Sequence, residues 1–149
     1  MKKILLCVLS LGIASCGGGE GTAVRDDLRV DLYSYGGFSG RAGGITVTGD
    51  SWAKFWTGRT AALRATRDSL KLDQDTLARI ASLAGSDEVA AFQFEKAGDL
   101  TTVLTIQRRG GFHRLSFVGE QVPGSFPQPV QDLISAMRNL RQTTTEEER

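Results

Sequence analysis

The chain has 149 residues, 40% of them hydrophobic and 23% charged, which is the composition of one ordinary globular domain. Its 18 Lys and Arg against 17 Asp and Glu leave a formal net charge of +1, so we expect no nucleic-acid partner. One His and two Cys exclude most metal and thiol chemistry, and no cofactor is expected.

The first residues have the anatomy of an export signal. Lys2 and Lys3 precede an apolar run over residues 4–15. This run is too short to cross a bilayer as a helix, which takes about 20 residues. We therefore predict that residues 1–15 are a signal peptide that is removed.

The run ends in Ile-Ala-Ser-Cys at positions 13–16, which resembles the lipobox of bacterial lipoproteins. The resemblance implies that Cys16 is acylated, with chains such as palmitate, and becomes the new N-terminus. An ordinary signal peptide with an incidental cysteine is the alternative. Gly17, rather than Asp, follows Cys16, which resembles the signal for passage to an outer membrane where the cell has one. The protein would then be exported and face the periplasm.

The glycine-rich residues 16–27 are predicted to form a lipidated, flexible tether with a root-mean-square reach of about 17–20 Å. Removal of the signal peptide also removes Cys7, so the mature chain would have no thiol besides the acylated one. We accordingly expect no disulfide, no cysteine-bound zinc and no cysteine nucleophile.

Residues 28–142 are predicted to form a single α+β domain, an antiparallel sheet of about five strands with two helices packed on one face. Alternating or short apolar segments predict strands at 28–33, 45–48, 52–57, 92–94, 102–108 and 112–118. Asp73 and Gly85 are suited to cap one helix, and a second begins near Pro129. Residues 58–71 lack a clear period and could prolong a hairpin or open a helix. Residues 143–149 are polar and predicted to be a disordered tail.

Catalytic patterns are missing from the sequence. His113 is the only imidazole, so any Ser-His-Asp triad would have to use it, and no Gly-x-Ser-x-Gly motif presents a serine. A zinc site would need three or four ligands such as His and Cys, and the sequence has no second His or Cys near His113 to form such a group. We interpret His113 as a partly covered residue at a strand end, and we do not expect an enzyme.

A glycine-rich loop stands out, with five glycines between residues 36 and 44. A phosphate-binding loop would lead into a helix and carry a Lys. Here the next predicted element is a strand, and the loop is not followed by a Lys. The glycines either allow tight turns or form a protruding loop with Phe38 at its tip for a protein partner. Trp52 and Trp56 would share one strand face, where they either pack against their neighbours or form a second exposed aromatic surface.

The segment Ser-Tyr-Gly-Gly-Phe-Ser-Gly-Arg at 34–41 resembles the strand and Gly-Gly-Phe-x-Gly loop of the emfourin (protealysin inhibitor) family. The helix from Asp73, the Phe-Gln-Phe segment at 92–94 that leads to Asp99, and Val-Pro at 122–123 before the last helix agree with it. The similarity extends over residues 28–140 in the order of elements. Emfourins inhibit thermolysin-type zinc metallopeptidases, so the resemblance implies a membrane-tethered relative of these inhibitors.

Two functions remain open from the sequence. One is a membrane-anchored lipoprotein of the bacterial envelope that acts as a non-catalytic protein-binding module. The other is an emfourin-like inhibitor that presents the Gly-Gly-Phe-Ser-Gly loop to a zinc metallopeptidase. The partner would be an envelope protein in the first case and the peptidase in the second. The candidate partner-binding residues are Gly36, Gly37, Phe38, Ser39, Gly40, Arg41, Trp52 and Trp56.

Overall fold

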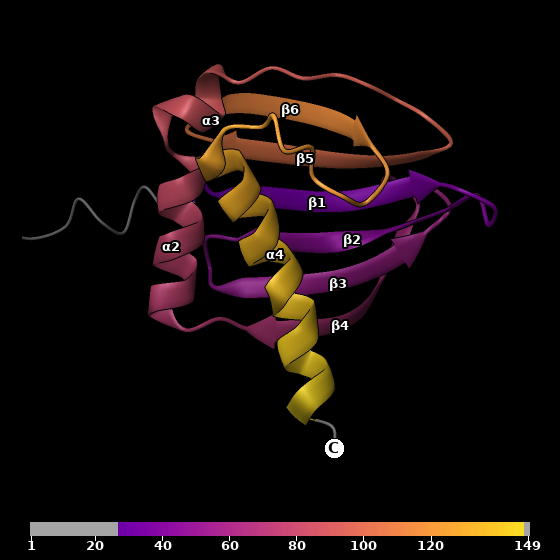
Figure 1. The fold of residues 1–149 in the computed structure, drawn as a ribbon. Coiled ribbons are helices and arrows are strands. Elements are labelled where there is room, and N and C mark those ends of the chain that lie inside the picture. The colour runs from indigo at the N-terminus through magenta and orange to yellow at the C-terminus, as the bar shows by residue number, and fades with distance from the viewer. Residues whose placement is uncertain (1–26, 148–149) are drawn as a thin grey trace, which may run out of the picture.

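The computed structural model describes residues 27–147, with side chains described to residue 141. The predicted signal peptide, Cys16 and the tether up to residue 26 lie outside the described residues. Within them, six antiparallel strands form one sheet in the order β4-β3-β2-β1-β5-β6, accompanied by three helices (Figure 1). The elements are β1 (Arg29–Gly36), β2 (Arg41–Thr48), β3 (Trp52–Gly58), β4 (Arg64–Lys71), α2 (Gln74–Ala84), α3 (Asp87–Ala91), β5 (Leu100–Arg108), β6 (Gly111–Val118) and α4 (Gln128–Glu147). The predicted α+β class and antiparallel sheet are confirmed, and the sheet has six strands where about five were expected.

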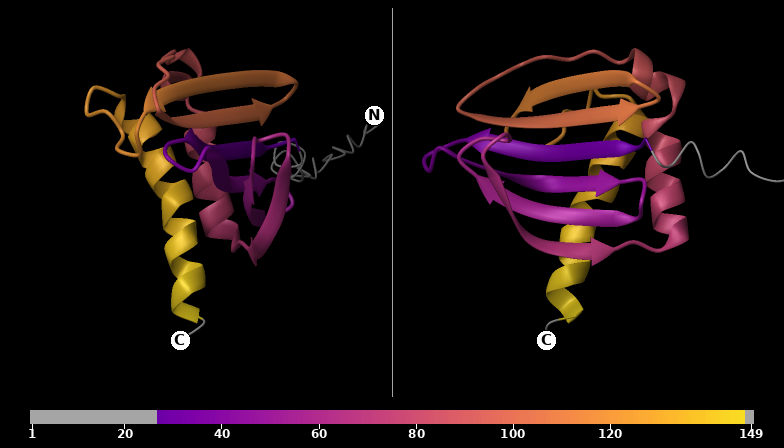
Figure 2. Two further views of the ribbon diagram at one scale, coloured as in Figure 1. Left: turned by 90° about the vertical axis from the view of Figure 1, so that its right-hand side faces the viewer. Right: turned by 180° about the vertical axis from the view of Figure 1, so that it is seen from behind.

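The core lies between one face of the sheet, here called the inner face, and helices α2 and α4. Figure 2 shows both helices on this side and no helix over the opposite, outer face of the sheet. Alternate residues of each central strand point inward because side chains of a strand alternate between its two faces. The buried inner residues are Val30, Leu32, Ile45, Val47, Ala53, Phe55, Leu104, Ile106, Leu115 and Phe117. Their alternation is the pattern that predicted the strands.

The unassigned segment at 58–71 contains strand β4, which pairs antiparallel with β3. The register shifts between Phe55 and Trp56, which marks a β-bulge. Nearly every residue of β4 is exposed, and only Leu70 packs partly against the core. An edge strand with so little burial has no reason to alternate in hydrophobicity, and for this reason the sequence alone did not identify it.

Both predicted helices form where the sequence placed their starts. Asp73 caps α2 by accepting a 2.8 Å hydrogen bond from the Thr76 N–H, and the Gly85 N–H donates to the Ala81 carbonyl at the other end. Helix α4 has Pro129 in its first turn and buries one apolar stripe, whose helical spacing is visible in the sequence: Val130, Leu133, Ile134, Met137 and Leu140. It continues to Glu147, five residues beyond the predicted end of the domain at residue 142.

The strand predicted at 92–94 is wrong. The short helix α3, capped by Ser86, precedes this segment, and the only β-pairing that the described residues show there is a parallel bridge between Glu95 and Ser116. Phe92 and Phe94 instead pack edge-on against Phe126, with ring centroids 4.8 and 4.9 Å from it. The alternation of Phe92 and Phe94 arises because both rings pack on the same side of an extended segment. This segment is not a strand of the sheet.

The sheet has two ends with different loops. At the N-terminal end, where β1 begins, Arg29 pairs with both Thr48 and Gln107, so the turns β2–β3 and β5–β6 lie there. At the distal end, Gly36 pairs with Arg41 and Leu100, so the β1–β2 loop lies there, as does the β3–β4 loop. The eight residues of β1 separate the two ends by about 26 Å.

Candidate functional site

The β1–β2 loop, residues 37–40, forms the tip of the distal end. Gly36, Gly37 and Gly40 have φ angles of 95°, 67° and 58°, which glycine adopts without strain. The Gly37 N–H donates a 2.5 Å hydrogen bond to the Asp99 carbonyl, and the Gly40 N–H donates to the Gly37 carbonyl at 3.2 Å. A Cβ at Gly36 would lie 2.0 Å from the Asp99 oxygen, so no other residue fits there. The loop is therefore held in one conformation against the start of β5.

Phe38 is fully exposed at the tip of this loop, as predicted. Ser39 and Arg41 are also exposed, and the Ser39 hydroxyl accepts a weak 3.4 Å hydrogen bond from the Arg41 N–H. The structure thus brings the six candidate loop residues together around an uncovered aromatic ring. An apolar ring held in water by a pinned backbone is suited to binding a partner.

Besides Phe38, the distal end carries three exposed apolar side chains that the sequence did not indicate. Four of the six exposed large hydrophobic residues among the described residues lie at this end: Tyr35, Phe38, Leu63 and Val118. Leu63 is 70% exposed in the β3–β4 loop, inside the segment whose path the sequence did not reveal. Tyr35 is at the last outer-face position of β1, where a strand pattern extended by two residues would have indicated it.

The two tryptophans do not extend this surface. Trp52 and Trp56 share the outer face of β3, as predicted, but the expected exposed pair is wrong because Trp56 is only 2% exposed. The Arg64 guanidinium lies 5.1 Å from the centroid of the Trp56 ring, and the Tyr33 ring centroid is 5.7 Å away. Trp52 is partly exposed, but it lies at the N-terminal end beside Lys71, away from Phe38.

A polar network that the sequence did not predict joins four strands on the outer face. The buried Asp31 carboxylate accepts hydrogen bonds from Arg29 Nε at 2.8 Å, Thr46 Oγ1 at 2.5 Å and Arg64 Nη1 at 3.1 Å. Trp56 Nε1 donates to Thr46 Oγ1 at 3.2 Å. Burial by itself would raise the pKa of Asp31, but the hydrogen bonds and charge of Arg29 and the bond from Thr46 outweigh it and hold this pKa below its usual value.

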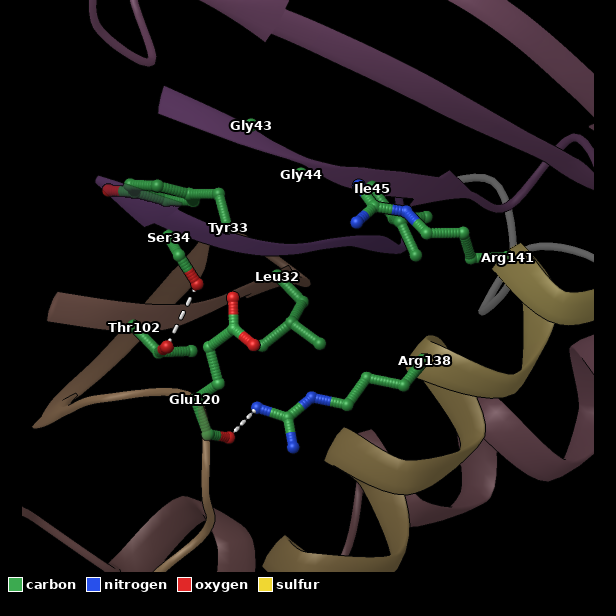
Figure 3. A pocket seen from close by; sticks show the side chains of 10 residues that line it. All are labelled: Leu32, Tyr33, Ser34, Gly43, Gly44, Ile45, Thr102, Glu120, Arg138 and Arg141. Atoms are coloured by element: carbon green, nitrogen blue, oxygen red, sulfur yellow. Dashed lines mark hydrogen bonds between the residues drawn. The ribbon is translucent and has the colours of Figure 1, made fainter. Parts of the chain in front are cut away.

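A pocket of about 300 Å³ lies between the inner face and α4 (Figure 3). Thr102 Oγ1 donates to the Gly119 carbonyl at 2.6 Å, so the 2.9 Å contact with Ser34 has Ser34 as donor. Arg138 donates to the Glu120 carbonyl. Burial lowers the pKa of Arg138, and the charge of Glu120 partly offsets this. The Arg138 bond ties the last helix to the loop after β6, and the Ser34 and Thr102 bonds tie β1 and β5 to the same loop.

His113 lies on the inner face beside the β5–β6 turn, half-buried, as the sequence analysis expected. Its Nε2 atom is buried without a hydrogen-bond partner among the residues that the structure describes. Within the same residues, no three His, Cys, Asp or Glu side chains gather closely enough to hold a metal ion.

Known proteins do not indicate what the site binds. No protein-family model matches the chain, and no curated protein is significantly similar to it in sequence. In residues 27–147, no helix combines the length and the apolar content that crossing a membrane requires.

Proposed function

We propose that the protein is a membrane-anchored lipoprotein of the bacterial envelope whose domain binds another protein through the β1–β2 loop. One observation carries the proposal: Phe38 is fully exposed at the tip of an ordered loop. The backbone of this loop is held in place by a hydrogen bond to the Asp99 carbonyl and by three glycines with positive φ. A loop that is already ordered loses little conformational entropy on binding, so more of the contact energy is available for affinity. No catalytic role is assigned to any residue.

The position of the loop relative to the start of the domain supports this proposal. The predicted tether of residues 16–27 leads to Leu28, which is buried and whose carbonyl accepts a hydrogen bond from the Gly49 N–H at the N-terminal end. Phe38 lies at the opposite end of the sheet, about 26 Å away along β1. An acylated Cys16 would therefore leave Phe38 directed away from the membrane that anchors the chain.

The anchor is tested by mass spectrometry of the protein isolated from its own cells. The proposal predicts loss of residues 1–15 and an acyl mass on Cys16, and both changes should disappear in the Cys16→Ser variant. An intact leader with an unmodified Cys16 would refute the anchor.

The binding surface is tested by placing a photo-reactive phenylalanine analogue at position 38 in living cells. Position 112 is the matched control because Phe112 is also a highly exposed phenylalanine, 68% exposed, but at the N-terminal end. We expect position 38 to cross-link a defined protein of the envelope that position 112 does not capture. Equal capture at the two positions would contradict a binding site in the loop.

Inhibition of a thermolysin-type zinc metallopeptidase is the second candidate function, and the full exposure of Phe38 at the loop tip favours it. By the resemblance to emfourins, such a peptidase would receive the Phe38 ring in the apolar pocket beside its zinc. Because Gly36, Gly37 and Gly40 have no side chains, the backbone of the loop could approach the peptidase closely. We expect a molar excess of the protein to slow proteolysis, and Phe38→Ala to weaken inhibition more than about tenfold, which is the effect of losing a hot spot. Unchanged proteolysis at large excess excludes this candidate.

A further inference from the structure

A second pocket lies at the N-terminal end of the sheet, between the β5–β6 hairpin and the junction of α2 with α3. Its volume is about 440 Å³. Ala84, Val89 and Ile106 form part of its apolar wall, and Arg108, Arg109 and His113 supply its basic groups. The hairpin end lies beside the two helices in Figure 1, so two stretches of the chain, 84–90 and 106–113, build this pocket.

The ionisable side chains that line this pocket are all basic, and the acidic Asp87 and Glu88 stand beside it in the first turn of α3. Two guanidinium groups and one imidazole line it, and none of the described residues that line it is acidic. Arg108 is half-buried and donates a 3.3 Å hydrogen bond to the Ala81 carbonyl, which holds its side chain across the end of α2. Arg109 is exposed in the turn. Such a group of donors is complementary to a phosphate, which accepts several charge-assisted hydrogen bonds at once.

His113 provides an independent indication of a ligand. Its Nε2 atom is buried and has no hydrogen-bond partner among the described residues. A buried polar atom without a partner costs free energy, so a turn of the ring that brought Nε2 to a ligand oxygen in the pocket would be favoured. The same side chain lines the pocket together with Arg108 and Arg109.

We propose that this pocket binds the phosphate of an anionic phospholipid headgroup in the membrane that anchors the chain. The proposal rests on the proposed function, because it uses the acylated Cys16. Arg29 pairs with Gln107, the neighbour of Arg108, so β1 begins beside the pocket. The tether of residues 16–27 would keep this end within about 20 Å of the bilayer.

The rim of the pocket fits a lipid surface. Phe112 lines the pocket and is 68% exposed, so an aromatic ring stands next to the two arginines. Phenylalanine side chains insert at the boundary between headgroups and acyl chains, and arginines near an anionic surface are attracted to it. The partner-binding loop remains free in this orientation because Phe38 lies at the other end of the sheet.

The test follows the imidazole ring of His113 by nuclear magnetic resonance in the full protein, purified in a non-ionic detergent. The chain has one histidine, so its ring signals need no assignment. Phosphatidylglycerol or phosphatidylcholine is added to the micelles, and inorganic phosphate is added to lipid-free micelles. Arg109→Asn removes one charge from the pocket, and asparagine tolerates the φ of 49° at this position. Arg67→Gln removes a charge from the exposed edge strand β4 and is the matched control.

We expect a saturable shift of the His113 signals with phosphatidylglycerol but not with phosphatidylcholine. Arg109→Asn should weaken the response about fivefold, while Arg67→Gln should not change it. An equal response to both lipids, an equal response to inorganic phosphate at the same concentration, or equal weakening by both variants would overturn the proposal. The mass of Cys16 in the same sample tests the anchor separately, and a phosphatidylglycerol response with unmodified Cys16 would still support the pocket.

Discussion

The two ends of the sheet each display an exposed phenylalanine beside a hairpin turn, yet their surroundings differ. At the distal end, Phe38 stands on a glycine loop pinned to the Asp99 carbonyl, and other exposed apolar side chains lie at the same end of the sheet. At the N-terminal end, Phe112 borders a pocket lined by Arg108 and Arg109. The kind of partner that an exposed aromatic ring suits therefore depends on the residues around it. A pinned loop that presents an apolar ring favours a protein partner, whereas two guanidinium groups that line a pocket favour an anionic surface.

The largest expected difference between the two ends concerns the glycines of their turns. Gly36→Ala combines a strained φ of 95° with a Cβ placed 2.0 Å from the Asp99 oxygen, and we expect it to lower the free energy of unfolding by about 3 kcal/mol. Gly110→Ala has the strain alone, at φ 73° with no atom within 4 Å of the new Cβ, and should cost about 1 kcal/mol. Urea unfolding of both variants measures the two losses, and equal losses would show that Asp99 does not pin the distal loop.

The second prediction concerns the Asp31 network that joins the strands between the two ends. Asp31→Asn removes the negative partner of Arg29 and Arg64, and we expect a loss of about 2 kcal/mol at pH 7. Because the folded state lowers the pKa of Asp31, its contribution is full above the ordinary carboxyl pKa of about 4 and disappears as the pH falls through the lower folded value. Unfolding of wild type and variant between pH 7 and pH 2 should therefore give a difference that narrows below about pH 4. A constant difference would contradict a charged network.

The third prediction separates binding from stability at the two phenylalanines. Phe38→Ala should reduce capture of the partner more than about tenfold, which corresponds to about 1.4 kcal/mol, because the ring would be the centre of the contact. Phe112→Ala should leave that capture unchanged. Both rings are exposed, so we expect each variant to keep the wild-type free energy of unfolding within about 0.5 kcal/mol. A large loss of stability in Phe38→Ala would assign the ring to packing instead.

The smallest effect is expected at Lys71, at the N-terminal end. Its ammonium lies 5.1 Å from the centroid of the Trp52 ring and donates a 2.7 Å hydrogen bond to the Asp50 carbonyl. These contacts are exposed, so Lys71→Ala should cost about 0.5 kcal/mol of stability. Thermal unfolding measures this loss, and a change in Trp52 fluorescence reports removal of the cation. A loss as large as that of Asp31→Asn would mean that Trp52 is a structural element of the outer face.

Local patterns in the sequence were sufficient where one side of a segment is buried. The alternation of apolar residues around Val30, Leu104 and Leu115 predicted three strands. The apolar residues at helical spacing up to Leu140 predicted the last helix. The glycine loop and its exposed Phe38 were also readable, because positive φ and an apolar residue between glycines are local properties. These features need no knowledge of distant residues.

The sequence by itself determined the α+β class, the caps of α2, the buried stripe of α4 and the position of Phe38, because periodicity and turn chemistry act over a few neighbouring residues. Tertiary structure decided the path of β4, and with it the burial of Trp56 under Arg64 and the exposure of Leu63. It also joined Arg109 and His113 to the α2–α3 junction in one pocket. Such contacts arise only when strands far apart in the chain are brought together, since burial and charge pairing depend on distance in space and not on separation in sequence.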